Sequence, residues 1–220
     1  DAINKGMQYM KESGSPYWEI PYLPIDPADV GRQYEPIIRI NSQSGKGGAA
    51  FVMQNTFGYH LPKAMHPEFG ALVKAECDRL GRELSSEELF GVFRRNYLEV
   101  PQKYSLEGHS LIENSGTQDG VHFKGSLKVD GQCRMIEGNG NGPIDAFFNA
   151  LKTVGVTGYT FESYHEHAIS TGSDSKAIAY IELKRPDGRS IFGVGIESNI
   201  NLASIKGVLC AINRSTLQEN

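Results

Sequence analysis

A stretch of alternating glycine and asparagine is the strongest candidate for chemistry in this sequence. Residues 138–143 are Gly-Asn-Gly-Asn-Gly-Pro. Apolar side chains then recur at spacings of three and four, as in an amphipathic helix, at Ile144, Phe147, Phe148 and Leu151. Pro143 suits the first turn of that helix because its missing N–H has no helical partner there. We expect a glycine-rich loop whose backbone N–H groups bind a carboxylate or phosphate at the positive end of the helix. The alternative is a tight strand-to-helix turn without a ligand.

A second polar segment, Thr-Gly-Ser-Asp-Ser at residues 171–175, joins two predicted strands. It is either a plain hairpin loop or a second set of polar groups facing the glycine-rich loop. In the second case Asp174 or main-chain carbonyl groups would hold an ammonium group. Together the two loops would suit a zwitterion such as an amino acid.

Two further patterns are weaker. His165 and His167 share one side of a predicted strand, because side chains alternate with a period of two. Such a pair could bind a metal, with Asp174 as a third ligand, but we favour a solvated or interface strand edge. Residues 44–48, Ser-Gly-Lys-Gly-Gly, lack the preceding glycine and the following Ser or Thr of a P-loop. We therefore predict a flexible turn at residues 42–48 rather than a nucleotide site.

The elements that would position these residues form a repeat. We expect strands at 104–112, 121–129 and 133–137 before the helix that starts at Pro143, and strands at 159–169, 177–183 and 190–196 before a second helix. Asp130-Gly131 and Pro186-Asp187-Gly188 would make hairpin turns. Residues 103–220 are thus predicted to be an α+β fold of two βββα units. Such a unit cannot bury all its apolar surface alone, so we expect the two to pack together about an internal pseudo-twofold.

The first half of the chain has a different character. Helices are predicted at 1–12, 67–80 and 87–97, the last opened by a capping box of Ser85 and Glu88. Residues 17–26 should be extended because of their prolines, residues 37–40 should form a short strand, and 49–55 could be helix or strand. We divide the chain into a segment at 1–36, a small mixed α/β subdomain at 37–102 and the repeat at 103–220.

Composition narrows the class of protein. The 220 residues are 39% hydrophobic with a formal net charge of −4, which predicts a globular domain and argues against a nucleic-acid partner. No apolar run approaches the roughly 20 residues that span a bilayer, so no membrane partner is expected. Cys77, Cys133 and Cys210 show no metal or disulfide spacing, which favours reduced, mostly buried thiols and a cytoplasmic location. The start of the chain has no signal-peptide pattern and looks cut from a longer protein.

Several motifs, in order along the chain, resemble the regulatory portion of the 2-isopropylmalate synthase family. Residues 140–151 are GNGPIDAFFNAL, 164–176 are YHEHAISTGSDSK, and 192–214 are FGVGIESNINLASIKGVLCAINR. Upstream, residues 16–32 (PYWEIPYLPIDPADVGR) and 40–48 (INSQSGKGG) resemble the linker of the longer form of the enzyme, and residues 1–6 (DAINKG) resemble the segment after its catalytic barrel.

The resemblance implies an acyltransferase that condenses acetyl-CoA with 2-oxoisovalerate in leucine biosynthesis. The family's TIM barrel, with its divalent metal, is absent here, so we expect no cofactor in this chain and no catalysis by it alone. Tyr22 is expected to reach an active site. The family also implies a homodimer that binds L-leucine for feedback inhibition. Carried across by motif, the leucine site comprises Gly140, Asn141, Gly142, Ile144, Asp145, Tyr164, Ala168, Gly172, Ser173, Asp174 and Ser175.

Three alternatives stay open. The same domain could be a dimerisation module without an effector, or it could be the equivalent domain of a citramalate or homocitrate synthase. A metal hydrolase centred on His165 and His167 is the alternative from the enzyme class. Leucine, isoleucine and lysine sensing would use similar loops, so the sequence alone does not choose the effector.

Overall fold

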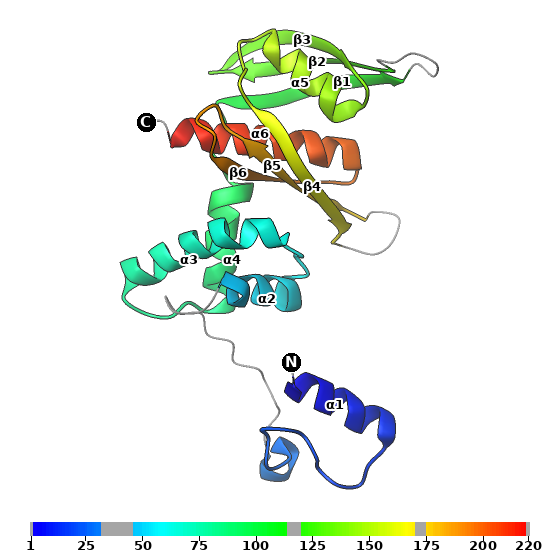
Figure 1. The fold of residues 1–220 in the computed structure, drawn as a ribbon, viewed down its shortest axis with the longest axis vertical. Helices are drawn as coiled ribbons and strands as arrows, with labels where there is room; N and C mark the ends of the chain where they lie inside the picture. The colour runs from blue at the N-terminus through cyan, green and yellow to red at the C-terminus, as the bar shows by residue number, and fades with distance from the viewer. Residues whose placement is uncertain (1, 32–45, 114–119, 170–174, 219–220) are drawn as a thin grey trace. The chain divides into compact units, whose positions relative to one another are not determined.

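The computed structural model describes residues 2–31, 46–113, 120–169 and 175–218, drawn as a ribbon in Figure 1. The chain divides into two compact units, Asp1–Ile38 and Arg39–Asn220. No helix in the described part of the chain has the length and hydrophobicity needed to cross a membrane.

The first unit contains α1 (Ala2–Ser13) and a short 3-10 helix η1 (Pro27–Val30). The predicted helix at 1–12 is confirmed, and it ends at Gly14, whose φ of 62° lies in the left-handed region that glycine tolerates. The segment predicted to be extended, residues 17–26, contains a turn at residues 21–22, closed by the Leu23 N–H donating to the Ile20 carbonyl at 3.2 Å. The Trp18 indole N–H also donates to the Leu23 carbonyl, at 2.7 Å. Asp26 caps η1 by accepting from the Ala28 N–H at 2.9 Å.

The second unit begins with helices, called here the helical subdomain: α2 (Lys46–Phe57), η2 (Lys63–Met65), α3 (His66–Leu80), α4 (Ser86–Phe93) and a π-helical turn η3 (Arg94–Leu98). Its core is aromatic, with Phe69, Phe93 and Tyr97 fully buried and their rings 5.1 to 6.3 Å apart. The predicted capping box is confirmed, because Ser85 accepts from the Glu88 N–H and Glu88 accepts from the Ser85 N–H.

The predicted turn at residues 42–48 is wrong for its last three residues, which open α2. Glycine in a helix costs about 1 kcal/mol relative to alanine. Burial of Ala49, Ala50, Val52 and Met53 against α3 and α4 offsets that cost. Residues 49–55, which could be helix or strand from the sequence, are helical because this conformation buries the same four side chains. Residues 42–45 and the predicted strand at 37–40 lie outside the described residues.

The rest of the unit confirms the predicted α+β fold of two βββα units. The first has β1 (Tyr104–Glu113), β2 (Val121–Val129), β3 (Gln132–Gly140) and α5 (Pro143–Lys152). The second has β4 (Thr160–Ala168), β5 (Ala177–Lys184), β6 (Ser190–Glu197) and α6 (Ile200–Leu217). Each sheet is antiparallel, in the orders β1-β2-β3 and β4-β5-β6.

The two βββα units correspond residue by residue. Both first strands carry a register shift at the same place, between Leu106 and Gly108 in β1 and between Phe161 and Ser163 in β4. The third strands both bring glycines under the helix, and one of these glycines occupies the same place in the two units. A Cβ on Gly138 would collide with the backbone of Ala146 and Ala150, and a Cβ on Gly195 would collide with Ala203 and Gly207, each 57 residues further on. This correspondence accounts for the internal pseudo-twofold expected from the sequence.

The prediction that residues 138–143 form a glycine-rich loop is wrong in extent. Gly138 and Gly140 belong to β3, and only Asn141 and Gly142 connect the strand to α5. The physical reason is helix packing: a Cβ on either strand glycine would meet the α5 backbone. These glycines therefore allow close approach of helix and strand rather than loop flexibility.

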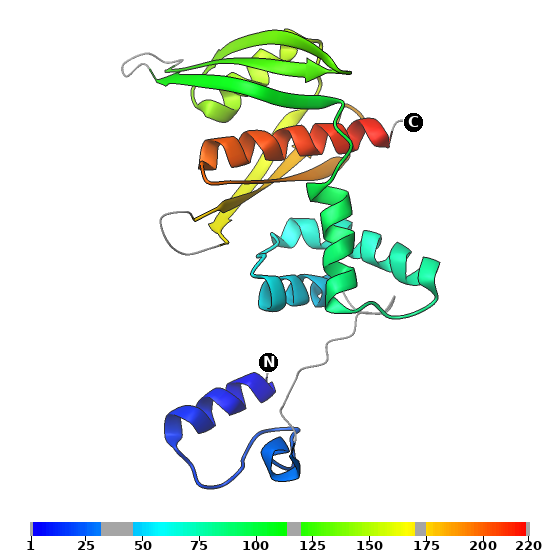
Figure 2. The same cartoon turned by 180° about the vertical axis from the view of Figure 1, so that it is seen from behind.

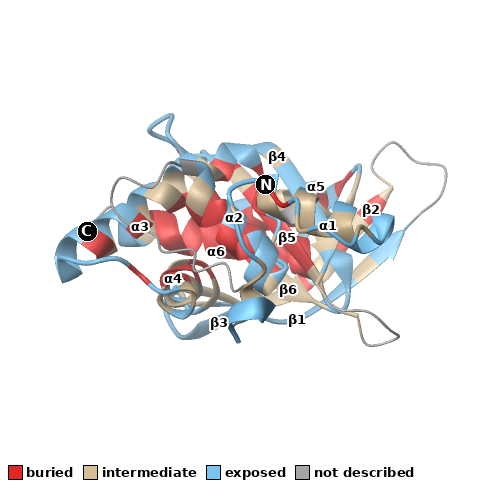
Figure 3. Ribbon diagram, turned by 90° about the horizontal axis from the view of Figure 1, so that it is seen from below, coloured by how far each residue is buried: buried red, intermediate tan, exposed pale blue. Residues whose placement is uncertain are grey.

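The two βββα units share one hydrophobic core, which is made by α5, α6 and the inner faces of both sheets. Figures 1 and 2 show α6 between the sheet of β1–β3 and the sheet of β4–β6. Burial is concentrated in α6, β5 and β6 (Figure 3), where twelve α6 residues are buried. The second face of the β4–β6 sheet is covered by the helical subdomain, which buries Tyr180 and Phe192.

Candidate functional site

A cavity of about 500 Å³ opens where α5 begins. One wall is the turn and first helical residues, Asn141 to Asp145. A second wall is the exposed side of α5, with Phe148, Asn149 and Lys152. The third wall comes from the other βββα unit, at Tyr159, Thr160 and Phe161 where β4 starts. The site is thus composite, made by the helix of one repeat unit and the first strand of the other.

The start of α5 supplies hydrogen-bond donors to this cavity. Pro143 is the first helical residue and Gly142 is the N-cap, with no side chain capping the helix. The N–H groups of Ile144 and Asp145 therefore have no partner within the helix, and the helix dipole favours an anion beside them. This corresponds to the anion site expected from the sequence, built from the helix itself rather than from a long loop.

Two side chains of opposite charge line the cavity. The Asp145 carboxylate accepts from the Asn141 N–H at 3.1 Å, which fixes the carboxylate at the mouth of the helix. Lys152 lies seven residues after Asp145 on α5, and its ammonium donates to the Asn149 side chain at 2.8 Å. Asn149 itself donates to the Asn139 carbonyl at 2.8 Å, so this polar wall is held in place.

The remaining lining is apolar. Ile144 and Phe148 are partly buried, and the Phe148 ring meets the Phe161 ring edge-on at 6.3 Å. Phe161 remains 38% exposed. The cavity can therefore hold a carboxylate at the helix start, an ammonium group at Asp145 and an aliphatic side chain over Ile144, Phe148 and Phe161.

The structure brings together four of the residues carried over by motif: Asn141, Gly142, Ile144 and Asp145 all line the cavity. Gly140 lies directly beneath the helix start, at the end of β3. Tyr164 and Ala168 lie further along β4 and outside the lining, on the same face of the sheet as Phe161. Ser175 lies just before β5, and Gly172, Ser173 and Asp174 fall outside the described residues.

Sequence reasoning missed part of the lining. Asn149 and Lys152 were readable from the sequence, because they follow Asp145 at spacings of four and seven, which places them on the same face of the helix. Tyr159, Thr160 and Phe161 were not, because only the packing of the two repeat units brings the start of β4 to α5. The duplication itself was the available signal, since it requires each helix to meet the other unit.

The histidine pair on β4 lies at the contact with the helical subdomain. His167 stacks on His60 with ring centroids 4.6 Å apart, and its Nε2 accepts from the His60 backbone N–H at 3.0 Å. Its Nδ1 lies 3.1 Å from the Ala168 carbonyl, and burial lowers the pKa of His167. His165 shares this face of β4. This is the interface strand edge favoured from the sequence, and within the described residues no three His, Cys, Asp or Glu side chains form a metal cluster.

A buried polar junction, not foreseen from the sequence, ties the helical subdomain to the second repeat unit. The Glu68 carboxylate on α3 accepts from the Arg214 guanidinium at 2.6 Å, from the Tyr97 hydroxyl at 2.7 Å and from the Phe192 N–H at 3.1 Å. Arg214 also donates to the Phe192 carbonyl, and its guanidinium lies 4.1 Å from the Tyr97 ring centroid. The Arg214 side chain is 6% exposed.

Two remaining groups of residues are placed as follows. Tyr22 lies in the first unit with its side chain 86% exposed and a φ of 67°. Cys77 and Cys210 are buried and Cys133 is exposed, all as free thiols, as expected from their spacing. Burial raises the pKa of Cys210 to about 11, so this thiol is unreactive at neutral pH.

Comparison with known families covers most of the chain. Residues 83–216 match the family described as the LeuA allosteric (dimerisation) domain. Residues 1–54 match the family described as alpha-isopropylmalate synthase, post-catalytic domain-like. The first match contains α4 and both repeat units, and therefore the whole cavity at the start of α5.

Comparison with individual proteins points to the same family. The chain is similar to proteins named 2-isopropylmalate synthase from Clostridium acetobutylicum (48% identical over 99% of this chain), Rhodospirillum rubrum (43% over 97%) and Rhizobium meliloti (44% over 97%). It spans 38–39% of the length of these relatives. The chain belongs to the 2-isopropylmalate synthase family, and residues 83–216 are its LeuA-type allosteric and dimerisation domain.

Proposed function

We propose that this chain binds L-leucine in the cavity at the start of α5 and thereby mediates feedback inhibition of a 2-isopropylmalate synthase. The parent enzyme would join acetyl-CoA to 2-oxoisovalerate on a TIM barrel that holds a divalent metal. The observation that carries the proposal is the lining of the cavity, which combines unpartnered helix N–H groups, the Asp145 carboxylate and an apolar wall.

Each part of leucine has a counterpart in this lining. The carboxylate accepts from the N–H groups of Ile144 and Asp145, with the helix dipole behind them. The ammonium group pairs with the Asp145 carboxylate, a charge-assisted contact. The isobutyl group lies over Ile144, Phe148 and Phe161, and burying it supplies roughly 1.5–3 kcal/mol. Lysine would place its second ammonium group on this apolar wall at a desolvation cost.

A second copy of the chain would complete the site. Phe161 and Tyr164 are 38% and 39% exposed on one face of β4, and Ala168 follows on the same face. We expect the homodimer to cover this face, so that Tyr164, Ala168 and the segment 172–175 close the leucine pocket. Family membership supports the dimer, since the matched domain is described as a dimerisation domain.

Inhibition further requires that leucine binds the inactive state of the enzyme more tightly than the active state, because a ligand with equal affinity for both shifts nothing. Tyr22 is proposed as a residue that reaches the catalytic barrel. It lies in the first unit, where its exposed side chain is available to a partner surface.

Calorimetric titration with L-leucine tests the proposal, with L-isoleucine and L-lysine as competitors. The informative variant is Asp145→Asn, which keeps an acceptor for the Asn141 N–H but removes the charge that would bind the ammonium group. We expect it to weaken leucine binding roughly tenfold or more, the size of a charge-assisted hydrogen bond. Glu87→Gln is the matched control, because Glu87 is also an acidic residue in the first turn of a helix.

One alternative is favoured by a specific observation. Asp145 already has an internal partner in the Asn141 N–H, so its carboxylate is hydrogen-bonded without an ammonium ligand. A dimerisation module with no effector therefore predicts a folded dimer that gives no heat with any of the three amino acids. That result in a dimeric sample would reject leucine sensing.

A further inference from the structure

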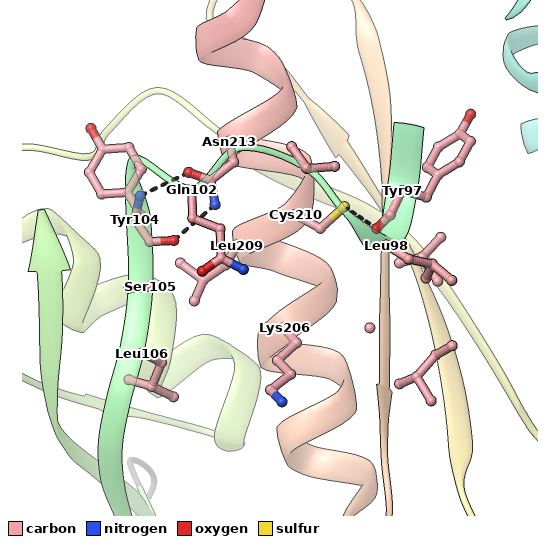
Figure 4. Close-up of a pocket in the computed structure, with 14 residues that line it drawn as sticks. Tyr97, Leu98, Gln102, Tyr104, Ser105, Leu106, Lys206, Leu209, Cys210 and Asn213 are labelled. Carbon is pink, nitrogen blue, oxygen red and sulfur yellow. Dashed lines mark hydrogen bonds between the residues drawn. The ribbon is translucent and has the colours of Figure 1, made fainter. Parts of the chain in front are cut away.

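A second cavity, of about 390 Å³, lies against α6 at the far side of the repeat. Figure 4 shows α6 behind it, the start of β1 on one side and η3 on the other. Its walls come from Tyr104, Ser105 and Leu106 of β1, from β6, and from the segment between η3 and β1 that includes Leu98, Val100 and Gln102.

This cavity is the counterpart of the α5 cavity under the internal pseudo-twofold. Tyr104, Ser105 and Leu106 occupy the positions in β1 that Tyr159, Thr160 and Phe161 occupy in β4, as the matching register shifts show. On the helices, the glycine contacts match Ala146 to Ala203, an offset of 57 residues. The same offset matches Asn149 to Lys206 and Lys152 to Leu209. In both cavities the helix of one unit meets the first strand of the other.

The charges of the two cavities differ. The α5 cavity contains both Asp145 and Lys152. Among the described residues that line the α6 cavity, Lys206 is the only charged side chain. Lys206 donates to Glu197 at 2.5 Å, and its side chain remains 45% exposed. An ammonium has three donors, so this ion pair leaves two for another acceptor.

Other polar groups in the α6 cavity are either neutral or already paired. Asn213 is held by the backbone of Tyr104, because it accepts from the Tyr104 N–H and donates to the Tyr104 carbonyl, both at 2.9 Å. The Cys210 thiol donates to the Tyr97 carbonyl. The Ser105 hydroxyl donates to the Glu107 carboxylate at 3.3 Å. The Gln102 amide lies on the cavity wall with Lys206. The aliphatic surface comes from Leu98, Val100, Leu106, Ile196 and Leu209.

We infer that the α6 cavity is a second small-molecule site, which binds a small aliphatic carboxylate that has no ammonium group. The carboxylate would accept from Lys206 and from the Gln102 amide, and the aliphatic body would pack on the leucine and valine side chains. An amino acid is disfavoured, because its ammonium group would lie near the Lys206 ammonium, and the nearby Glu197 carboxylate is already paired with that lysine. The duplicated fold thus holds one zwitterion pocket and one monoanion pocket.

The position of this site gives it access to the helical subdomain. Tyr97 and Leu98 at the end of η3 form one of its walls, whereas none of the described residues lining the α5 cavity belongs to the helical subdomain. A ligand here would therefore contact both repeat units and the segment that leads into the repeat, so its binding would be coupled to the packing of η3 on α6.

Methyl NMR of the 220-residue chain tests this inference with two ligands that differ only by an ammonium group. 4-Methylpentanoate is L-leucine without its amino group. We expect it to shift the methyl signals of Leu98, Val100, Leu106, Ile196 and Leu209 with a dissociation constant of about 1 mM or tighter, which is within reach of a ligand of this size. L-Leucine should leave those signals unchanged.

Variants identify the cation. Lys206→Met should weaken 4-methylpentanoate binding roughly tenfold or more, whereas Lys206→Arg, which keeps the charge, should retain it. An unchanged spectrum away from the cavity shows that each variant is folded. Asp145→Asn should leave 4-methylpentanoate binding intact, which separates this site from the proposed leucine site.

Three outcomes overturn the inference. The first is no shift at these methyl groups up to about 10 mM. The second is equal binding by wild type and Lys206→Met, and the third is tighter binding of L-leucine than of 4-methylpentanoate in the α6 cavity. None of them bears on whether leucine binds at α5.

Discussion

Replacing Arg214 by methionine should release the helical subdomain from the repeat. The substitution keeps an unbranched apolar chain but removes the guanidinium that contacts Glu68, the Phe192 carbonyl and the Tyr97 ring. Glu68 would keep its bonds from the Tyr97 hydroxyl and the Phe192 N–H, but its carboxylate would lose its counter-charge.

The size of the effect follows from burial. The Arg214 and Glu68 side chains are 6% and 25% exposed, and removing one partner of a buried ion pair typically costs about 3–5 kcal/mol. Because Glu68 keeps some solvent contact, we expect about 3 kcal/mol, the lower end of that range. The Arg79 pair with Glu76 provides the control: Arg79 is 65% exposed, so Arg79→Met should cost far less stability than Arg214→Met.

Urea denaturation followed by fluorescence and circular dichroism measures both variants. A double variant, Arg214→Met with Glu68→Leu, should recover part of the loss, because no unpaired buried carboxylate remains. If Arg214→Met loses no more stability than Arg79→Met, the junction does not hold the subdomain and the reasoning is refuted.

Three further perturbations have defined outcomes. Ser85→Ala removes the N-cap of α4 and should lower the free energy of unfolding by about 1 kcal/mol, measured by urea denaturation; no change would mean that the capping box is dispensable. Gly195→Ala drives a Cβ into the α6 backbone and should destabilise by about 1–3 kcal/mol or more, whereas Gly47→Ala, with no atom within 4 Å of the new Cβ, should be neutral or stabilising. Burial lowers the pKa of His167, so below about pH 6.5 the unfolded chain binds a proton that the folded chain excludes, and stability should fall as the pH drops through that window. Urea midpoints between pH 8 and 5 should show a shallower loss in His167→Gln, and identical pH profiles would contradict this assignment.

The sequence predicts the repeat well because local patterns determine most of it. Alternation of apolar residues defines β2, and the turn at Asp130-Gly131 fixes its hairpin with β3. The capping box places the start of α4 for the same reason, since all its partners lie within four residues. Such features depend on short-range geometry, which a single sequence carries.

What the sequence could not give depends on contacts between distant elements. Gly138 and Gly140 look like loop residues until the approach of α5 explains them. The junction of Glu68 with Arg214 joins residues 146 positions apart, and no local pattern pairs them. The β4 wall of the candidate site was likewise invisible, because it depends on how the two repeat units pack.

A crystal structure of the chain grown with L-leucine would show whether leucine binds at the start of α5. We expect one leucine at the start of each α5, with its carboxylate on the N–H groups of Ile144 and Asp145, its ammonium group on the Asp145 carboxylate, and its side chain over Phe148 and Phe161. Leucine bound elsewhere, or an empty α5 cavity in a dimer at saturating leucine, would contradict it.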